Sequence, residues 1–179
     1  VRPLQIGVGQ IDIPQIGVRK LSKIALIGNY LPRKCGIATF TTDTRNALAE
    51  RYPDLHVDVY AMEDEAERRA YPREVAGVVR QNDISDYFAV PQQTNDTGAD
   101  AVWLQHEYGI FGGPAGDLII RLLDRVTAPL VMTLHTILSH PNADQRRVMD
   151  ALLRRASRII VMSEMGKRLL EEVHGVNRD

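Results

Sequence analysis

The stretch that decides the fold begins with Lys23-Ile-Ala-Leu-Ile-Gly28, continues through Asn-Tyr-Leu-Pro-Arg-Lys-Cys, and enters Gly36-Ile-Ala-Thr-Phe-Thr-Thr-Asp43. Its first part is a short apolar run of strand type, and apolar residues recur with helical spacing from Gly36 onward. A strand, a glycine-bearing loop and a helix N-terminus are the usual parts of an anion or substrate site in an α/β fold, because free N–H groups meet the positive end of the helix dipole there. The motif is common, so its weight depends on whether similar loops recur later in the chain.

Strand and helix patterns alternate along the rest of the chain. Further strands are predicted at residues 55–61, 75–79, 101–104, 130–134 and 158–162. Helices are predicted at 84–90, ended by Pro91, at 114–125, with Pro114 first, at 142–155 and at 163–173, and the charged run 63–69 predicts one or two helical turns.

The predicted strands are continuous runs of Val, Ile and Leu, which leave no polar face for solvent. Such strands, alternating with helices, indicate a parallel sheet covered by helices on both sides. The sequence therefore predicts an α/β, three-layer Rossmann-like domain with a mainly parallel sheet over residues 23–179. Residues 1–22 contain two prolines and three glycines without a clear period, and we expect an N-terminal arm or extension on the surface, or alternatively a short edge strand.

Composition narrows the class of protein. The chain has 179 residues, 44% of them hydrophobic and 25% charged, with a net charge of −1, as in an ordinary soluble globular protein. Lys and Arg are not in excess, so no nucleic-acid partner is expected. The single cysteine excludes an internal disulfide and suits a reducing compartment. We see neither a signal-peptide pattern nor an apolar run long enough for a transmembrane segment, and expect a cytoplasmic location.

Three predicted strand-to-helix loops are chemically unusual. They are residues 28–36, the segment His106-Glu-Tyr-Gly-Ile-Phe-Gly-Gly113, and the segment His135-Thr-Ile-Leu-Ser-His-Pro141. Because the carboxyl ends of parallel strands meet at one edge of a sheet, we expect these loops to share that edge. Two histidines, one carboxylate and several glycines would then converge on one rim.

Each of these residues has an alternative interpretation. The alternative for His106 and His135 is that they are simple hydrogen-bonded rim residues. The alternative for Glu107 is that it pairs with a neighbouring basic group. The adjacent His106 and Glu107 lack the second histidine of a His-Glu-x-x-His zinc motif, so no metal is expected. Arg33 and Lys34 are candidates for binding a phosphate, with a solvated loop pair as the alternative. Cys35 is interpreted as a small packing residue, because no orienting partner for a nucleophile can be placed.

Four motifs together carry a family resemblance: Pro-Arg-Lys-Cys-Gly-Ile-Ala-Thr-Phe at 32–40, Gln-His-Glu-Tyr-Gly-Ile-Phe-Gly-Gly at 105–113, Thr-Leu-His-Thr at 133–136 and Val-Met-Ser-Glu at 161–164. In this order they resemble the N-terminal half of GT-B glycosyltransferases of the retaining family 4, or group 1, type. The resemblance covers about residues 23–179. It implies that the C-terminal Rossmann-like domain, which carries the nucleotide-sugar site in such enzymes, is absent from this chain, and that the chain by itself is inactive.

The resemblance also implies roles for single residues. His135 matches the histidine that lines the cleft near the transferred sugar, and it is the candidate catalytic residue. Gly36 and Ile37 would face the cleft near the donor diphosphate and the acceptor. Family members often have two glycines at that point, where this chain has Cys35 and Gly36.

The same resemblance assigns the second loop to the acceptor. His106 and Glu107 match the rim segment on the acceptor side. The helix N-terminus expected after Gly112 and Gly113 would bind acceptor hydroxyls or phosphate through its N–H groups.

The implied partners are a nucleotide-sugar donor and a sugar or polyol acceptor, with no cofactor. The sequence is compatible with a homo-oligomer and does not determine the oligomeric state. The implied reaction is retaining transfer, in which the protein positions the sugar and stabilises the leaving diphosphate. The alternative is a stand-alone Rossmann or flavodoxin-like module that binds a nucleotide or an anion without catalysis. Against a dinucleotide domain, the first turn lacks the Gly-x-Gly-x-x-Gly pattern.

Overall fold

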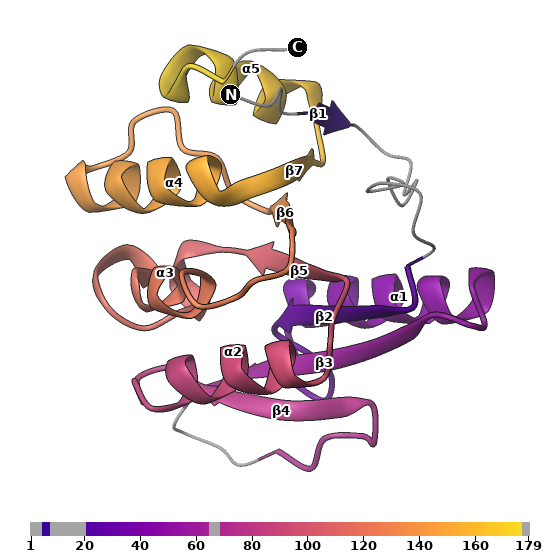
Figure 1. Cartoon of the computed structure of the whole chain (residues 1–179). Helices are drawn as coiled ribbons and strands as arrows, with labels where there is room; N and C mark the ends of the chain where they lie inside the picture. Colours follow the sequence, from indigo (N-terminus) through magenta and orange to yellow (C-terminus); the bar gives the residue numbers. More distant parts are fainter. Residues whose placement is uncertain (1–4, 8–20, 65–68, 177–179) are drawn as a thin grey trace.

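The fold is a three-layer α/β sandwich built on one parallel sheet, in a computed structural model that describes residues 5–7, 21–64 and 69–176 (Figure 1). The seven strands are ordered β1-β7-β6-β5-β2-β3-β4, and every neighbouring pair is parallel. The strands are β1 Gln5–Gly7, β2 Lys23–Gly28, β3 His56–Glu63, β4 Val75–Arg80, β5 Ala101–His106, β6 Leu130–Leu134 and β7 Ala156–Val161. The predicted fold class is confirmed.

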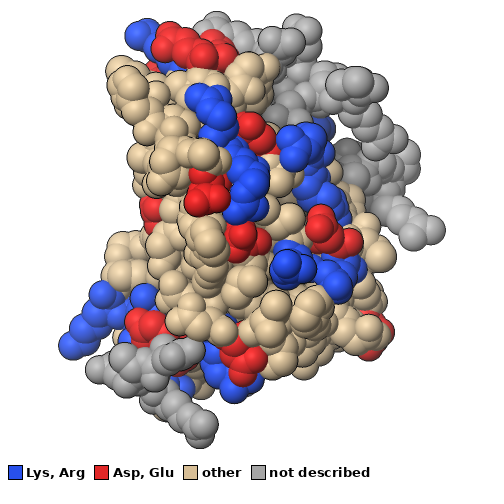
Figure 2. Space-filling model, turned by 90° about the vertical axis from the view of Figure 1, so that its left-hand side faces the viewer, with Lys and Arg blue, Asp and Glu red and all other residues tan. Residues whose placement is uncertain are grey.

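Helices cover both faces of the sheet. They are α1 Gly36–Arg51, α2 Asp86–Asp96, α3 Leu118–Leu123, α4 Ala143–Arg155 and α5 Glu164–His174, with short 3₁₀ turns η1 Tyr108–Ile110 and η2 Pro114–Gly116. In Figure 1, α1 lies on one side of the sheet, and α2, α3 and α4 lie on the other. The face covered by these three helices carries interleaved basic and acidic residues with no field of one sign (Figure 2).

Two apolar cores lie between these layers, because successive residues of a strand point to opposite faces. Along β2, Ile24 and Leu26 pack in the core that includes Leu48 of α1. Ala25 and Ile27 pack in the larger core, which takes residues from α2, α3, α4 and α5. Strands buried on both faces explain the continuous apolar runs of the sequence.

The parallel pairing places the three unusual loops at one edge of the sheet, as predicted. The loops after β2, β5 and β6 all leave from strand carboxyl ends, and the three strands are direct neighbours in the order β6-β5-β2. We call this edge the carboxyl edge. The backbone N–H of His135 donates to the carbonyl of His106 at 3.0 Å, so two of the loops are hydrogen-bonded where they begin.

Helix α2 differs from its prediction at both ends. It begins after Ser85 and continues through Pro91 to Asp96. Pro91 removes one backbone hydrogen bond, which would have gone to the carbonyl of Tyr87. Burial offsets that loss: Pro91 itself is buried, and the fully buried Tyr87 donates its hydroxyl to the carbonyl of Gln81 at 2.8 Å.

The predicted helix 114–125 is wrong in its first turn. Pro114 starts only the 3₁₀ turn η2, and Ala115 and Gly116 then take positive φ values of 53° and 77°. The α-helix begins four residues after Pro114, at Leu118, and spans six residues. Proline is favoured at the first position of a helix, but this preference does not predict the left-handed backbone conformation of the two residues that follow it here.

Two further expectations are settled only in part. Gln5–Gly7 forms an edge strand beside β7, which is the alternative considered for the N-terminal segment. Residues 1–4 and 8–20 lie outside the described residues. In the charged run 63–69, Glu63 is the last residue of β3 and not helical, while residues 65–68 also lie outside the described residues.

The predicted caps of α4 and α5 are confirmed. Ser163 accepts a hydrogen bond from Gly166 N at the start of α5, and Gly175 ends that helix with φ 66°. Asn142 forms a capping box with Gln145 at the start of α4, each side chain accepting from the other's backbone N–H at 2.9 Å.

Replacing Asn142 by Ala should lower the free energy of unfolding by about 1 kcal/mol, because the α4 terminus loses its side-chain acceptor. Urea denaturation measures the change. Asn46→Ala, at an exposed position inside α1, is the matched control and should cause no loss, since alanine is the better helix former. Equal effects of the two substitutions would contradict the assigned cap.

Candidate functional site

The candidate site is centred on His135, the first residue after β6. Its backbone continues the hydrogen-bonded ladder to β5, and its half-buried ring meets Phe40 of α1 edge to face, with centroids 5.0 Å apart. Burial lowers the pKa of His135, while the nearby carboxylate of Glu107 acts in the opposite direction. The ring is therefore neutral near pH 7, in a position fixed by the sheet and by α1.

Gln105 is a site residue that the sequence analysis did not single out. It is fully buried, and its Oε1 lies 2.9 Å from His135 Nε2. The sequence signal that could have found it is its spacing from Trp103: the two residues lie two positions apart in β5, so both side chains point to the α1 face of the sheet. The predicted strand stopped at Leu104, so this signal was lost.

His106 lies beneath the rim and not on it. The structure extends β5 to this residue, and the ring is completely buried, 5.0 Å from the Tyr108 ring and 6.0 Å from the Phe111 ring between centroids. Among the described residues, neither ring nitrogen has a hydrogen-bond partner. Burial, reinforced by the nearby His135, lowers the pKa of His106 to about 3. In this conformation the ring cannot contact a ligand directly.

Glu107 ties two loops of the carboxyl edge together. Its Oε1 accepts from Tyr108 N at 2.9 Å, which caps η1, and its Oε2 accepts a hydrogen bond from the Thr136 hydroxyl in the loop after β6. Both carboxylate oxygens therefore already have donors within the protein.

The helix N-terminus expected directly after Gly112 and Gly113 lies further along the chain, at Leu118. Gly112 is buried, and its N–H donates to the Tyr87 hydroxyl at 3.0 Å. A Cβ at Gly112 would lie 2.0 Å from the carbonyl oxygen of Gln81, so this glycine is required by packing. The N–H of Gly116 donates to the carbonyl of Gly113 and the N–H of Leu118 to the carbonyl of Gly112, each at 3.1 Å, so these two N–H groups are already bonded within the chain.

The N-terminus of α1 is capped by the only cysteine. Cys35 Sγ accepts from Ala38 N at 3.4 Å and from Asn29 Nδ2 at 3.3 Å, so its role here is structural. Gly36 is exposed, and beyond its chain neighbours and its own helix backbone no atom lies within 4 Å of the place that a Cβ would occupy. Ile37 is half-buried and packs against the larger core.

The two basic residues of this loop differ in their surroundings. Arg33 pairs with Asp64 at 3.0 Å, just past the end of β3. Lys34 is exposed. Of the two predicted phosphate ligands, Arg33 is thus already held by a carboxylate.

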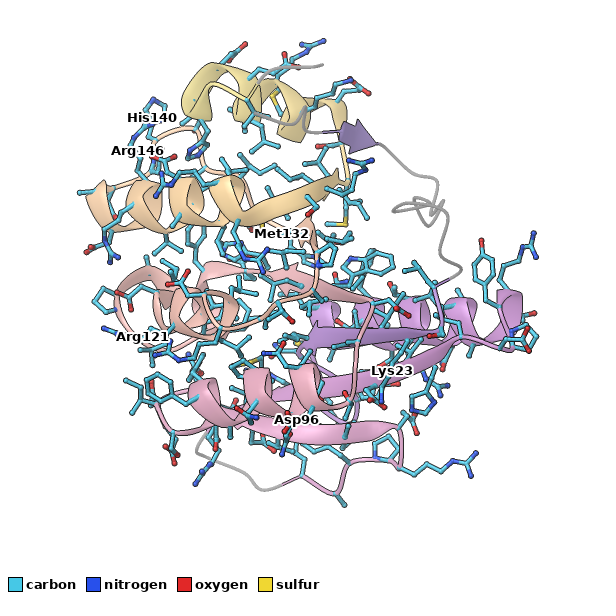
Figure 3. The ribbon with its side chains drawn as sticks, viewed as in Figure 1. Lys23, Asp96, Arg121, Met132, His140 and Arg146 are labelled. Atoms are coloured by element: carbon cyan, nitrogen blue, oxygen red, sulfur yellow. The ribbon has the colours of Figure 1, made fainter. Side chains whose placement is uncertain are left out.

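A cavity of about 270 Å³ opens beside His135, near the lower end of ligand-pocket volumes, roughly 300 Å³. It lies between the loop after β6 and the start of α5. Its wall consists of Leu134, His135, Thr136, Ile137, Met162, Ser163, Met165, Gly166 and Leu169. His140, at the far end of the same loop, is exposed near the start of α4, where Figure 3 also labels Arg146.

Two structural features do not occur in the part of the chain that the structure describes. No three His, Cys, Asp or Glu side chains gather there as a ligand set for a metal ion. Within the same residues, no helix has both the length and the apolar composition needed to cross a bilayer.

Comparison with known proteins gives one family. A family model described as Glycosyltransferase Family 4 matches residues 35–179. A search of curated proteins finds no match. Among solved structures, S. aureus homoserine dehydrogenase at pH 6.5 is 12% identical with a TM-score of 0.35, covering 78% of this chain and 31% of the other. An uncharacterized protein is 9% identical with a TM-score of 0.38, covering 85% of this chain and 50% of the other. The chain spans half or less of the length of these structures.

The buried His106 should make the fold sensitive to acid. The unfolded chain binds a proton at this residue near pH 6.5 and the folded chain only near pH 3. Between these values the unfolded state holds more protons, so the free energy of unfolding falls as the pH falls. Between pH 6.5 and about pH 5, His106→Leu should lose about 1–2 kcal/mol less stability than the wild type, at roughly 1.4 kcal/mol per pH unit. Urea denaturation at the two pH values measures this, and equal losses would refute the assignment.

Proposed function

Because the chain belongs to Glycosyltransferase Family 4, we propose that it is the N-terminal, acceptor-side domain of a retaining glycosyltransferase that uses a nucleotide-sugar donor. One observation supports placing the site at His135: this neutral histidine is fixed at the carboxyl edge in the wall of a small cavity. This edge is where open parallel sheets bind their ligands. The acceptor is a sugar or polyol, and the protein is cytoplasmic.

A second Rossmann-like domain completes the proposed enzyme. It supplies the contacts to the nucleotide and closes the cleft over the transferred sugar, which excludes water from the reaction. The 179-residue chain alone should therefore show no enzyme-level transfer with a panel of nucleotide sugars and acceptors. A stand-alone binding module without catalysis is the alternative, and the family match favours the transferase.

In the proposed reaction, the anomeric carbon gains oxocarbenium character as the nucleoside diphosphate leaves. The protein's contribution is positioning and stabilisation of charge. Glu107 is engaged by Tyr108 N and the Thr136 hydroxyl, so we assign it the role of holding the acceptor-side loops together and not that of a nucleophile. His135 contributes a neutral ring that hydrogen-bonds a sugar hydroxyl without adding a permanent charge.

In the protein that carries this domain together with its donor-binding domain, His135→Ala should lower the rate of transfer about 10²–10³-fold, the typical cost of one lost transition-state contact. Its effect on stability should be about 0.5–1.5 kcal/mol, the value of one hydrogen bond. Steady-state kinetics and urea denaturation measure the two quantities.

His140→Ala is the matched control, because His140 lies exposed on the same loop and its Nδ1 contacts the neighbouring Ser139 hydroxyl, at 3.0 Å. It should leave transfer unchanged. Near-normal transfer by His135→Ala, together with a much lower stability, would make His135 a structural residue and remove the proposed site.

A further inference from the structure

Polar side chains form a diagonal ladder between β5 and β6 on the face of the sheet that α1 covers. In the parallel register, Trp103 lies opposite Val131, and Gln105 lies opposite Thr133. Each β5 side chain instead bonds the residue that lies two positions after its register partner. Trp103 Nε1 donates to Thr133 Oγ1 at 2.9 Å. The contact of Gln105 Oε1 with His135 Nε2, also 2.9 Å, is the second rung of the same pattern.

The second rung is built into the core. Gln105 is fully buried, as is Thr133 beside it. The space for Gln105 depends on Gly28 of β2, because a Cβ there would lie 2.8 Å from Gln105 Cβ and 3.2 Å from its Cγ. The whole side chain is thus shielded from solvent, with its Oε1 toward His135, while its Nε2 has no hydrogen-bond partner among the described residues.

The chemistry of the amide decides which ring nitrogen carries the proton. An amide oxygen only accepts hydrogen bonds, so His135 Nε2 must be the donor. A neutral imidazole has one donor and one acceptor nitrogen, which leaves Nδ1 as the acceptor. Among the described residues, Nδ1 has no hydrogen-bond partner. The perpendicular contact with Phe40 fixes the plane of the ring.

We propose that Gln105 is a positioning residue that holds His135 in the neutral Nε2–H tautomer, so that Nδ1 accepts a hydrogen bond from a ligand hydroxyl. The tautomer follows from contacts within this chain. The identity of the ligand as a sugar rests on the proposed function. A ring fixed in this way selects a group that donates, and a hydroxyl is such a group.

Nuclear magnetic resonance of the 179-residue chain with ¹⁵N-labelled histidine tests the tautomer directly. Long-range ¹H–¹⁵N correlations are recorded at about pH 8, where an ordinary histidine is neutral, and the His135 signals are assigned by their loss in His135→Ala. We expect one tautomer with the proton on Nε2. Gln105→Leu should give a mixture of both tautomers. Thr133→Val, the matched control, removes only the first rung and should keep the single tautomer.

Two results would overturn the proposal: a proton on Nδ1 in the wild type, or an unchanged single tautomer in Gln105→Leu. If Gln105→Leu does not fold, Gln105→Met takes its place, because it keeps the unbranched shape and removes the amide. The wild-type spectrum decides the proton position in either case.

Activity gives a separate measurement in the protein that carries both domains. Gln105→Leu should lower kcat about 10–100-fold, by analogy with groups that orient metal-binding histidines, and Thr133→Val should leave it unchanged. If the tautomers are as expected but neither Gln105→Leu nor His135→Ala affects transfer, the proposed function fails while the positioning of the ring by Gln105 stands.

Discussion

The parallel pairing of β5 with β6 is the constraint on which the site depends. It aligns Gln105 with Thr133 and His106 with Leu134, so that His135 leaves the sheet directly beside the end of β5. The hydrogen bond from His135 N to the carbonyl of His106 extends that register by one residue into the loops. Because β2 pairs with the other side of β5, the loop that leads into α1 reaches the same place.

Alternation along β5 gives neighbouring residues different environments. Gln105 points to the face covered by α1 and reaches His135, while His106 points to the opposite face and is enclosed by Tyr108 and Phe111. Burying an imidazole without hydrogen-bond partners is costly for its charged form, and the pKa of His106 falls to about 3. The two histidines of the sequence motifs thus have separate roles: one lies beneath the rim as a neutral core residue, and the other lies in a cavity wall.

Most of the fold was predictable from local chemistry. The caps of α4 and α5 follow from single side chains at Asn142 and Ser163, and the strands follow from apolar runs. Tertiary packing determined what the sequence could not reveal. Burial of Tyr87 and Pro91 carries α2 past a proline, and the positive φ of Ala115 removes the helix start expected at Pro114.

The site was predictable in its location but not in its contacts. The shared edge followed from parallel strands joined by right-handed connections, and the choice of His135 followed from the family resemblance. The polar end of β5 was interpreted as loop, so the burial of Gln105 and His106 was missed. Glu107 and Gly112 also carried functional predictions, yet the structure uses their polar groups for bonds to Thr136 and Tyr87. Such pairings join residues that are distant in the sequence, and single-sequence patterns do not encode them.

The central claim is that this domain binds its sugar substrates at the carboxyl edge around His135. Backbone amide shifts of the ¹⁵N-labelled chain, recorded while candidate sugar and polyol acceptors are added, test it most directly. We predict that the changes gather in residues 28–36, 135–141 and 161–166. Changes confined to the opposite edge of the sheet, in residues 53–55 and 127–129, would contradict it.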